Sequence, residues 1–264
     1  EKPYEFRHNP SSASTVRDGK VEGSCMRQMY YKATSEPASN PRGFTTKLQG
    51  LMGDAIHDKV LAKLQKSKRF TVMPEAAGKV TMDGLGKEIS FRLDGLVSAN
   101  GEIGGLELKT MNSFGLQKMV REGGPKAGHY LQVMSYFGTN AALKWFALVY
   151  LGRDNAYRAE YHIERIGNVF NVHRILPYGP SFRLEGYEFS KIRHRWADTE
   201  RAVQAREIPA REYKVVFNDA GNIVPSRVKN KVEYASDWQC MWCIYKDTCW
   251  SSKDAREFAV KIPS

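Results

Sequence analysis

The strongest constraint on the fold is a pair of alternating segments on either side of Asn100-Gly101. In EISFRLDGLV, residues 88–97, apolar and polar residues alternate as in a strand with one buried face. Asn-Gly favours a tight hairpin turn, and IGGLELKT, residues 103–110, supplies the returning strand. Because side chains alternate with period two, Glu107 and Lys109 must share one face. The sequence therefore predicts a hairpin that presents an acid and a base together.

Segments around this hairpin predict helices and further strands. Apolar residues recur every four positions from Leu48 to Val60, which indicates a helix, and residues 126–140 predict a second one. KWFALVYL is almost continuously apolar and is expected to be a central strand. YRAEYHIE is a further strand, and a loop around LPYGPSF leads into a long helix at residues 187–206. This order predicts an α/β or α+β domain with a mixed sheet.

Composition narrows the class of protein. With 42% hydrophobic residues, the 264-residue chain can bury a core, and no apolar run reaches the length of a membrane span. The segment EKPYEFRHNP lacks the apolar centre of a signal peptide, so a cytoplasmic protein is expected. The net charge of +11 suits a polyanionic partner such as nucleic acid.

The four cysteines form an unusual pattern. Cys240, Cys243 and Cys249 make a C-x2-C-x5-C run, and Cys25 lies far upstream. In a protein without a secretory signal, such clustering favours a metal centre over disulfides. Four thiolates suit a [4Fe–4S] cluster or structural zinc, although zinc sites more often use two close pairs. Unpaired core cysteines account poorly for the run.

The polar face of the hairpin is a candidate catalytic site. Asp94 lies on the strand next to Glu107 and Lys109, and two carboxylates with a lysine suit a hard divalent cation and an activated water. An exposed sheet face with one Glu–Lys pair is the competing interpretation. On the first helix, Gly53 and His57 lie one turn apart, and the glycine leaves room for a metal, a substrate or a close backbone approach.

Together these motifs resemble a known family. G-x3-H, D, E-x-K and Q-x3-Y follow one another in the order seen in RecB-like nucleases of the PD-(D/E)XK superfamily, with Gln132 and Tyr136 forming the last motif. The four cysteines narrow the resemblance to iron–sulfur exonucleases of the CRISPR-associated, fourth Cas family type, which has phage-encoded relatives. The motifs run from Cys25 to Cys249, nearly the whole chain. Leu93 replaces the loosely kept proline before Asp94, and no P-loop of a helicase motor occurs.

The resemblance implies a role for each matched residue. His57, Asp94, Glu107 and the backbone carbonyl of Leu108 would bind Mg²⁺ or Mn²⁺, and an imidazole ligand favours manganese. Lys109 would orient the attacking water and stabilise charge on the phosphate. The remaining roles fall to residues that support the site, bind DNA or hold the cluster. Gln132 and Tyr136 would support the site and bind the DNA backbone, Arg27 would contact DNA or the cluster lobe, and Cys25, Cys240, Cys243 and Cys249 would ligate a structural [4Fe–4S] cluster.

The resemblance also predicts the organisation of the chain. It implies a single nuclease domain over residues 1–264, with a restriction-endonuclease-like core of a central mixed sheet and flanking helices at about 46–210. The iron–sulfur lobe would join residues 20–45 to residues 225–255. Trp238, Trp242 and Trp250 would shield the cluster from water or stack on bases.

The implied activity is exonucleolytic cleavage of DNA, with single-stranded ends taken 5′ to 3′ and duplex ends as a further candidate substrate. The cell would be bacterial, archaeal or phage-infected, and the partners would be proteins of recombination or CRISPR adaptation. Basic residues of the helix segment KIRHRW could line a channel for the strand or form a solvated helix face. The alternatives are a non-catalytic DNA- or partner-binding module of the same fold and a structural-zinc protein with an unrelated activity.

Overall fold

The computed structural model describes residues 6–81, 85–167, 169–179, 181–184, 189–218, 223–224 and 236–250. The chain divides into two compact units. The core unit comprises residues 7–24 and 45–198. The cysteine unit comprises residues 25–44 and the segment from Thr199 onward, together with the first six residues.

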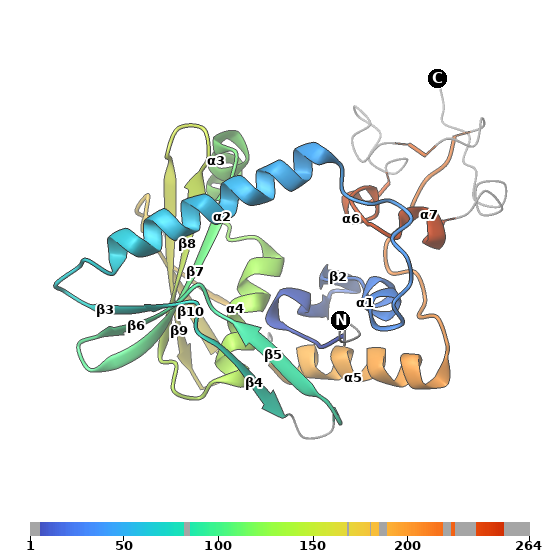
Figure 1. The fold of residues 1–264 in the computed structure, drawn as a ribbon, viewed down its shortest axis with the longest axis horizontal. Helices are drawn as coiled ribbons and strands as arrows, with labels where there is room; N and C mark the ends of the chain where they lie inside the picture. Colours follow the sequence, from blue (N-terminus) through green and yellow to red (C-terminus); the bar gives the residue numbers. More distant parts are fainter. Residues whose placement is uncertain are drawn as a thin grey trace. The chain divides into compact units, whose positions relative to one another are not determined.

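The core unit is built on a mixed seven-stranded sheet (Figure 1). Only β7 and β8 run parallel, and the other neighbouring pairs in this sheet are antiparallel. The apolar segment predicted to be central forms β8, which occupies the fourth of the seven positions. In sheet order the strands are β11 (Phe182–Leu184), β10 (Val169–Leu176), β9 (Arg158–Ile166), β8 (Trp145–Gly152), β7 (Glu102–Met111), β6 (Gly95–Ala99) and β3 (Thr71–Pro74).

Helices cover both faces of this sheet. On one face, Leu61 of α2 (Phe44–Leu64) packs with Leu106 and Leu108 of β7. On the other face, Tyr136 of α4 (Ala127–Thr139) stacks on Phe146 of β8, with ring centroids 5.5 Å apart. The predicted α/β fold with a central mixed sheet flanked by helices is confirmed.

The first predicted helix begins earlier than expected and is less buried. It starts at Phe44, and its side chains at Leu48, Leu51 and Met52 are exposed. Only Gly53 and Leu61 along α2 are buried. The four-residue apolar spacing therefore identified the helix but did not mark a continuous buried face.

The predicted hairpin is present, but its first strand is interrupted. Asn100 and Gly101 have φ values of 52° and 80°, the left-handed conformation that a type I′ turn requires. The chain leaves regular pairing at Leu93 and Asp94, where it passes from β5 (Glu88–Arg92) to β6. β5 pairs instead with β4 (Ala77–Thr81) in a separate two-stranded sheet, here called the β4–β5 ribbon. This change of partner places Asp94 at the rim of the large sheet.

Several elements of the core unit were not predicted from the sequence. In β10 the alternating residues Phe170 and Val172 are buried, a pattern that marks a strand. The predicted loop around residues 176–182 follows β10, and α5 (Phe189–Ala205) matches the predicted long helix. The other additions are β11 and η1 (Pro10–Ser12), β1 (Ser14–Arg17), β2 (Lys20–Gly23) and α3 (Ser113–Arg121).

The cysteine unit combines an early and a late part of the chain. Its helices are α1 (Met26–Ala33), α6 (Trp238–Met241) and α7 (Lys246–Cys249). Tyr30 and Tyr31 of α1 pack with Tyr245, next to Cys243 and Cys249. Residues 225–235 and 251–255 of the predicted iron–sulfur lobe lie outside the described residues. None of the described helices is both long and apolar enough to cross a membrane.

Candidate active site

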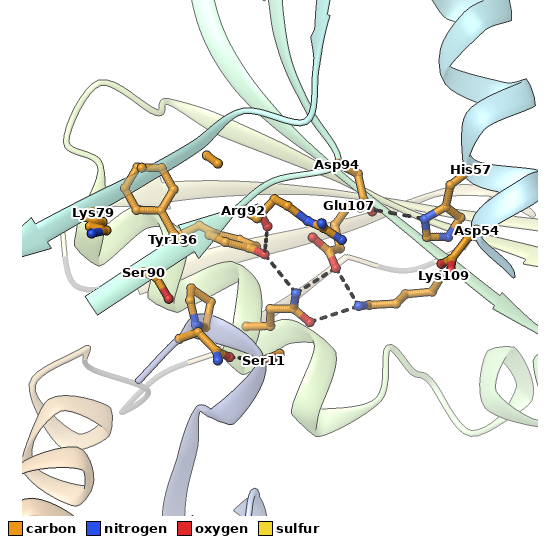
Figure 2. Close-up of a pocket in the computed structure, with 16 residues that line it drawn as sticks. Ser11, Asp54, His57, Lys79, Ser90, Arg92, Asp94, Glu107, Lys109 and Tyr136 are labelled. Carbon is orange, nitrogen blue, oxygen red and sulfur yellow. Dashed lines mark hydrogen bonds and ion pairs between the residues drawn. The ribbon is translucent and has the colours of Figure 1, made fainter. Parts of the chain in front are cut away.

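A polar cavity of about 710 Å³ lies in the core unit (Figure 2). Its lining comes from η1, α2, the β4–β5 ribbon, β7 and α4. We call this cavity the acidic pocket. It brings together six of the residues named from the sequence motifs: His57, Asp94, Glu107, Lys109, Gln132 and Tyr136.

Asp94 and Glu107 meet at the rim of the sheet. The Oδ2 atom of Asp94 accepts a hydrogen bond of 2.6 Å from the backbone N–H of Leu108, which orients this carboxylate. Its Oδ1 atom lies 3.7 Å from Nδ1 of His57. Glu107 is only 3% exposed, and its Oε1 atom accepts a hydrogen bond of 2.8 Å from Nε2 of Gln132. Its Oε2 atom is buried and has no hydrogen-bond partner among the described residues.

The surroundings of Glu107 oppose its negative charge. Burial, together with the nearby carboxylate of Asp94, raises the pKa of Glu107 to about 7, although Lys109 acts in the opposite direction. The ammonium of Lys109 lies 2.5 Å from Oε1. The charge of Lys109 thus does not offset the effects of burial and of Asp94 on Glu107.

Lys109, Gln132 and Tyr136 form a hydrogen-bonded chain. Nζ of Lys109 donates to Oε1 of Gln132 at 3.0 Å, and Nε2 of Gln132 also lies 3.0 Å from the hydroxyl of Tyr136. That hydroxyl donates to the backbone carbonyl of Arg92 at 2.6 Å. Burial raises the pKa of Tyr136, so the phenol keeps its proton and remains a donor. The chain fixes the position of the Lys109 ammonium beside Glu107.

Helix α2 brings His57 to the pocket. A Cβ atom on Gly53 would lie 3.0 Å from Oγ1 of Thr110, so the glycine permits the close approach of α2 to β7. Close backbone approach is one of the three roles that the sequence suggested for Gly53. Leu108 lies between the two polar residues of β7, with its side chain buried on the opposite face.

Other residues of the site had not been identified from the sequence. Asp54 lines the pocket three positions before His57, a spacing that places both on one helical face. Arg92 and Lys79 line the pocket from the ribbon. His129 lies outside the lining of the pocket and is half-buried, with Nδ1 2.9 Å from the hydroxyl of Tyr150; desolvation, with the charge of Lys109, lowers its pKa to about 3. His129 is therefore neutral.

The donor set of the acidic pocket fits a divalent cation. Two carboxylates and an imidazole are suitable ligands, and the unpartnered buried oxygen of Glu107 would gain a partner. The described side chains nevertheless form no group of three or more His, Cys, Asp or Glu residues that could hold a metal ion in the present arrangement. Asp94 and His57 lie 3.7 Å apart, between Oδ1 and Nδ1.

The four cysteines all lie in the cysteine unit, and none forms a disulfide. Burial raises the pKa of Cys240 to about 12, and the other three thiols, those of Cys25, Cys249 and Cys243, add to this rise. Their mutual influence shows that the four sulfur atoms share one neighbourhood. As in the acidic pocket, the described residues form no group of three or more cysteines that could hold a metal ion in the present arrangement, so the cluster stays a prediction.

Arg27 belongs to the same neighbourhood. Its Nη1 atom donates to Sγ of Cys249 at 3.6 Å, and its Nε atom donates to the carbonyl of Pro209 at 2.6 Å. Of the two roles expected for Arg27, these contacts correspond to the one in the cluster lobe.

The tryptophans near the cysteines differ in exposure. Trp238 and Trp242 are 61% and 74% exposed. Trp250 packs with Phe217 and with Cys240, and the guanidinium of Arg211 lies 4.2 Å from the centroid of its ring. Shielding of the thiols stays a prediction, and of the three tryptophans Trp250 is the one packed beside Cys240.

The basic helix segment KIRHRW is only partly available to a ligand. Arg195 is buried, and its Nε atom donates to the hydroxyl of Ser14 at 2.7 Å. Neither a DNA channel nor a solvated face therefore describes Arg195, whereas Lys191 and His194 are exposed.

Comparison with known proteins gives similarity at the level of structure. No protein-family profile and no curated protein matches the sequence. The solved structure described as SSO0001 is 17% identical, covers 85% of this chain and 81% of its own, and has a TM-score of 0.47. An alkaline exonuclease from Laribacter hongkongensis is 14% identical over 69% of this chain and 78% of its own, with a TM-score of 0.44. Its complex with dAMP is similar at 13% identity, with the same coverage and TM-score.

Proposed function

We propose that the chain is a metal-dependent deoxyribonuclease that hydrolyses phosphodiester bonds at DNA ends. The observation that carries this proposal is the buried carboxylate of Glu107, which has one unpartnered oxygen beside Asp94 and a fixed ammonium of Lys109. Burying such a group is costly unless a cation compensates its charge. A purely structural sheet face would not require this arrangement.

Each residue has a distinct part in the proposed reaction. His57, Asp94, Glu107 and the backbone carbonyl of Leu108 would hold Mg²⁺ or Mn²⁺. A cation bound there would lower the pKa of a water molecule and polarise the scissile phosphate. Lys109 would orient the attacking water and stabilise the negative charge that develops on the phosphate oxygens.

The supporting residues keep Lys109 in place. Gln132 accepts a hydrogen bond from Lys109 and donates one to Glu107, so it fixes the relative position of acid and base. Tyr136 holds the strand before Asp94 through the carbonyl of Arg92. Preorganisation of this kind reduces the rearrangement needed to reach the transition state.

The cysteine unit would hold a structural [4Fe–4S] cluster through Cys25, Cys240, Cys243 and Cys249. Cys25 precedes α1, whereas the other three lie in or near α6 and α7. A cluster would therefore connect an early and a late part of the chain, and its binding energy would contribute to folding.

The substrate of this enzyme would be single-stranded DNA degraded from an end, 5′ to 3′, with duplex ends as a further substrate. The net charge of +11 favours binding of the phosphate backbone. A role in DNA recombination or in CRISPR-linked end processing, in a bacterial, archaeal or phage-infected cell, follows from the resemblance of the motifs.

Degradation of end-labelled DNA tests the proposal. Linear and circular substrates, single- and double-stranded, are incubated with the wild type, Glu107→Ala and Lys118→Ala in the presence of Mn²⁺ or Mg²⁺. Lys118 lies on α3 and forms an exposed ion pair with Glu122, so its substitution serves as a surface control. We expect the wild type and Lys118→Ala to degrade linear single strands and Glu107→Ala to leave them intact. Equal degradation by all three proteins would refute the assigned site.

A non-catalytic DNA- or partner-binding module is the second candidate. The present arrangement of the described side chains, which forms no group able to hold a metal ion, is the observation that favours it. Binding of single strands without degradation by any metal-loaded wild-type protein would identify the chain as such a module.

A further inference from the structure

The acidic pocket contains a cation that the proposed chemistry does not use. Three basic side chains line it: Lys79, Arg92 and Lys109. Lys109 is bound to Glu107 and Gln132, and Lys79 lies 3.4 Å from Glu88. Among the residues that the structure describes, none forms a hydrogen bond or ion pair with the guanidinium of Arg92. Figure 2 shows Arg92 among the side chains around the pocket.

The backbone of Arg92 is firmly held although its side chain has no described partner. Its carbonyl accepts the hydrogen bond of 2.6 Å from the hydroxyl of Tyr136. Arg92 pairs with Ala77 in the ribbon, and the next residue, Leu93, donates its N–H to the carbonyl of Ala76 at 2.8 Å. The base of the Arg92 side chain is therefore fixed relative to the residues that hold Glu107 and Lys109.

Arg92 belongs to a polar row that leads to the two carboxylates. Ser90, Arg92 and Asp94 all line the pocket, and Lys79 is paired with Ser90 across the ribbon. At about 3.3 Å per residue, this row is roughly 13 Å long. It changes from basic and polar groups on the ribbon to the acidic end at Asp94. Because Lys79 is paired with Glu88, Arg92 is the cation of this row that can attract a phosphate beside the carboxylates.

We propose that Arg92 binds a backbone phosphate of the substrate strand next to the bond that is cut, with the β4–β5 ribbon as the supporting wall. This inference rests on the proposed nuclease function and names a substrate-binding residue for it. The planar guanidinium can donate two parallel hydrogen bonds to a phosphate, which an ammonium cannot do in the same geometry. Such a contact positions the strand without reading its bases.

Binding of a fluorescent single-stranded oligonucleotide, followed by anisotropy in EDTA over a range of salt concentrations, tests the proposal without requiring cleavage. We expect Arg92→Ala to weaken binding about tenfold and to reduce the slope of log K against log salt by about 0.7, the value for one phosphate contact on a single strand. Arg92→Lys should keep the slope and recover part of the affinity. Lys118→Ala removes an equal charge from α3 outside the pocket and should change neither quantity.

Melting temperatures of all variants verify their folding, and Arg92→Gln replaces Arg92→Ala if the alanine variant unfolds. The proposal would be overturned if the folded Arg92 variant kept the wild-type affinity and salt slope. It would also be overturned if the Arg92 and Lys118 variants lost affinity equally, or if the wild type did not bind the oligonucleotide. If the wild type binds with an Arg92-dependent slope but never degrades DNA, the nuclease function fails while the Arg92 contact stands.

Discussion

The acidic pocket and the cysteine group are organised by different means. In the pocket, Glu107, Lys109 and Gln132 hydrogen-bond directly to one another from β7 and α4, elements that the sheet and its core hold in place. The other three cysteines influence Cys240 electrostatically, but Cys25 lies just before α1, the rest lie in or near α6 and α7, and no disulfide joins them. A site built on regular elements can remain assembled by its own hydrogen bonds, whereas the proposed cluster would be what joins the four thiols.

Loss of the lysine in the pocket should have the largest effect. Lys109→Ala removes the ammonium that Gln132 and Glu107 hold, so we expect the rate constant for DNA cleavage to fall about 10²–10³-fold while iron content is unchanged. Single-turnover degradation measures the rate, and Lys118→Ala is the control. A cleavage rate within twofold of the wild type would exclude the proposed role of Lys109.

Substitution of one cysteine tests the proposed role of the cysteine unit. Cys240→Ser should lose iron and the visible absorbance of a cluster, and the free energy of unfolding should fall by about 3 kcal/mol or more. For a chain of this size that corresponds to a melting temperature lower by roughly 10 °C. Metal analysis and thermal melting, both under nitrogen, measure these effects. Zinc in place of iron would instead support the structural-zinc alternative.

The free energy of unfolding of the chain should depend on pH through Glu107. Its pKa is about 7 in the folded chain against 4.5 ordinarily, so the folded state binds the proton more tightly. Stability is therefore lost as pH rises from about 4.5 to about 7. Without metal, Glu107→Gln should be more stable than the wild type at pH 8, by about 2 kcal/mol, and should lose this advantage at pH 4. Melting curves at the two pH values measure the difference, and a pH-independent difference would contradict the assigned burial.

Substitutions of two tryptophans should give the smallest changes in the free energy of unfolding. Trp242→Ala should change the free energy of unfolding by less than about 0.5 kcal/mol because the side chain is largely exposed. Trp250→Ala should cost about 1–2 kcal/mol because this side chain packs with Phe217 and Cys240. Denaturant titration measures both changes. Equal effects would remove the distinction between an exposed and a packed tryptophan.

The sequence predicts the fold well where a pattern is local. Alternation identified the strands around Asn100-Gly101, and apolar continuity identified β8 as central. The same alternation predicted a single strand through Leu93. In the structure this segment is two strands, because β5 pairs with β4 whereas β6 pairs with β7 in the large sheet. That change depends on long-range hydrogen bonds, such as that from Tyr136 to the carbonyl of Arg92, which local spacing does not encode.

The same limit applies to the candidate site. Ordered motifs identified six of the polar residues that line the acidic pocket, and the functional roles of these six remain predictions. Arg92 and Asp54 were not assigned because neither belongs to a motif. The burial of Arg195 was also not predicted, since its partner, Ser14, lies far away in the sequence.

Direct titration of Mn²⁺ into the pocket tests the central claim, that two carboxylates and an imidazole bind a divalent cation. Calorimetry should show that the wild type binds Mn²⁺ and that Glu107→Gln and Asp94→Asn each weaken this binding at least about tenfold, whereas Lys118→Ala does not. Equal Mn²⁺ affinity in all four proteins, or no binding by the wild type, would contradict the account.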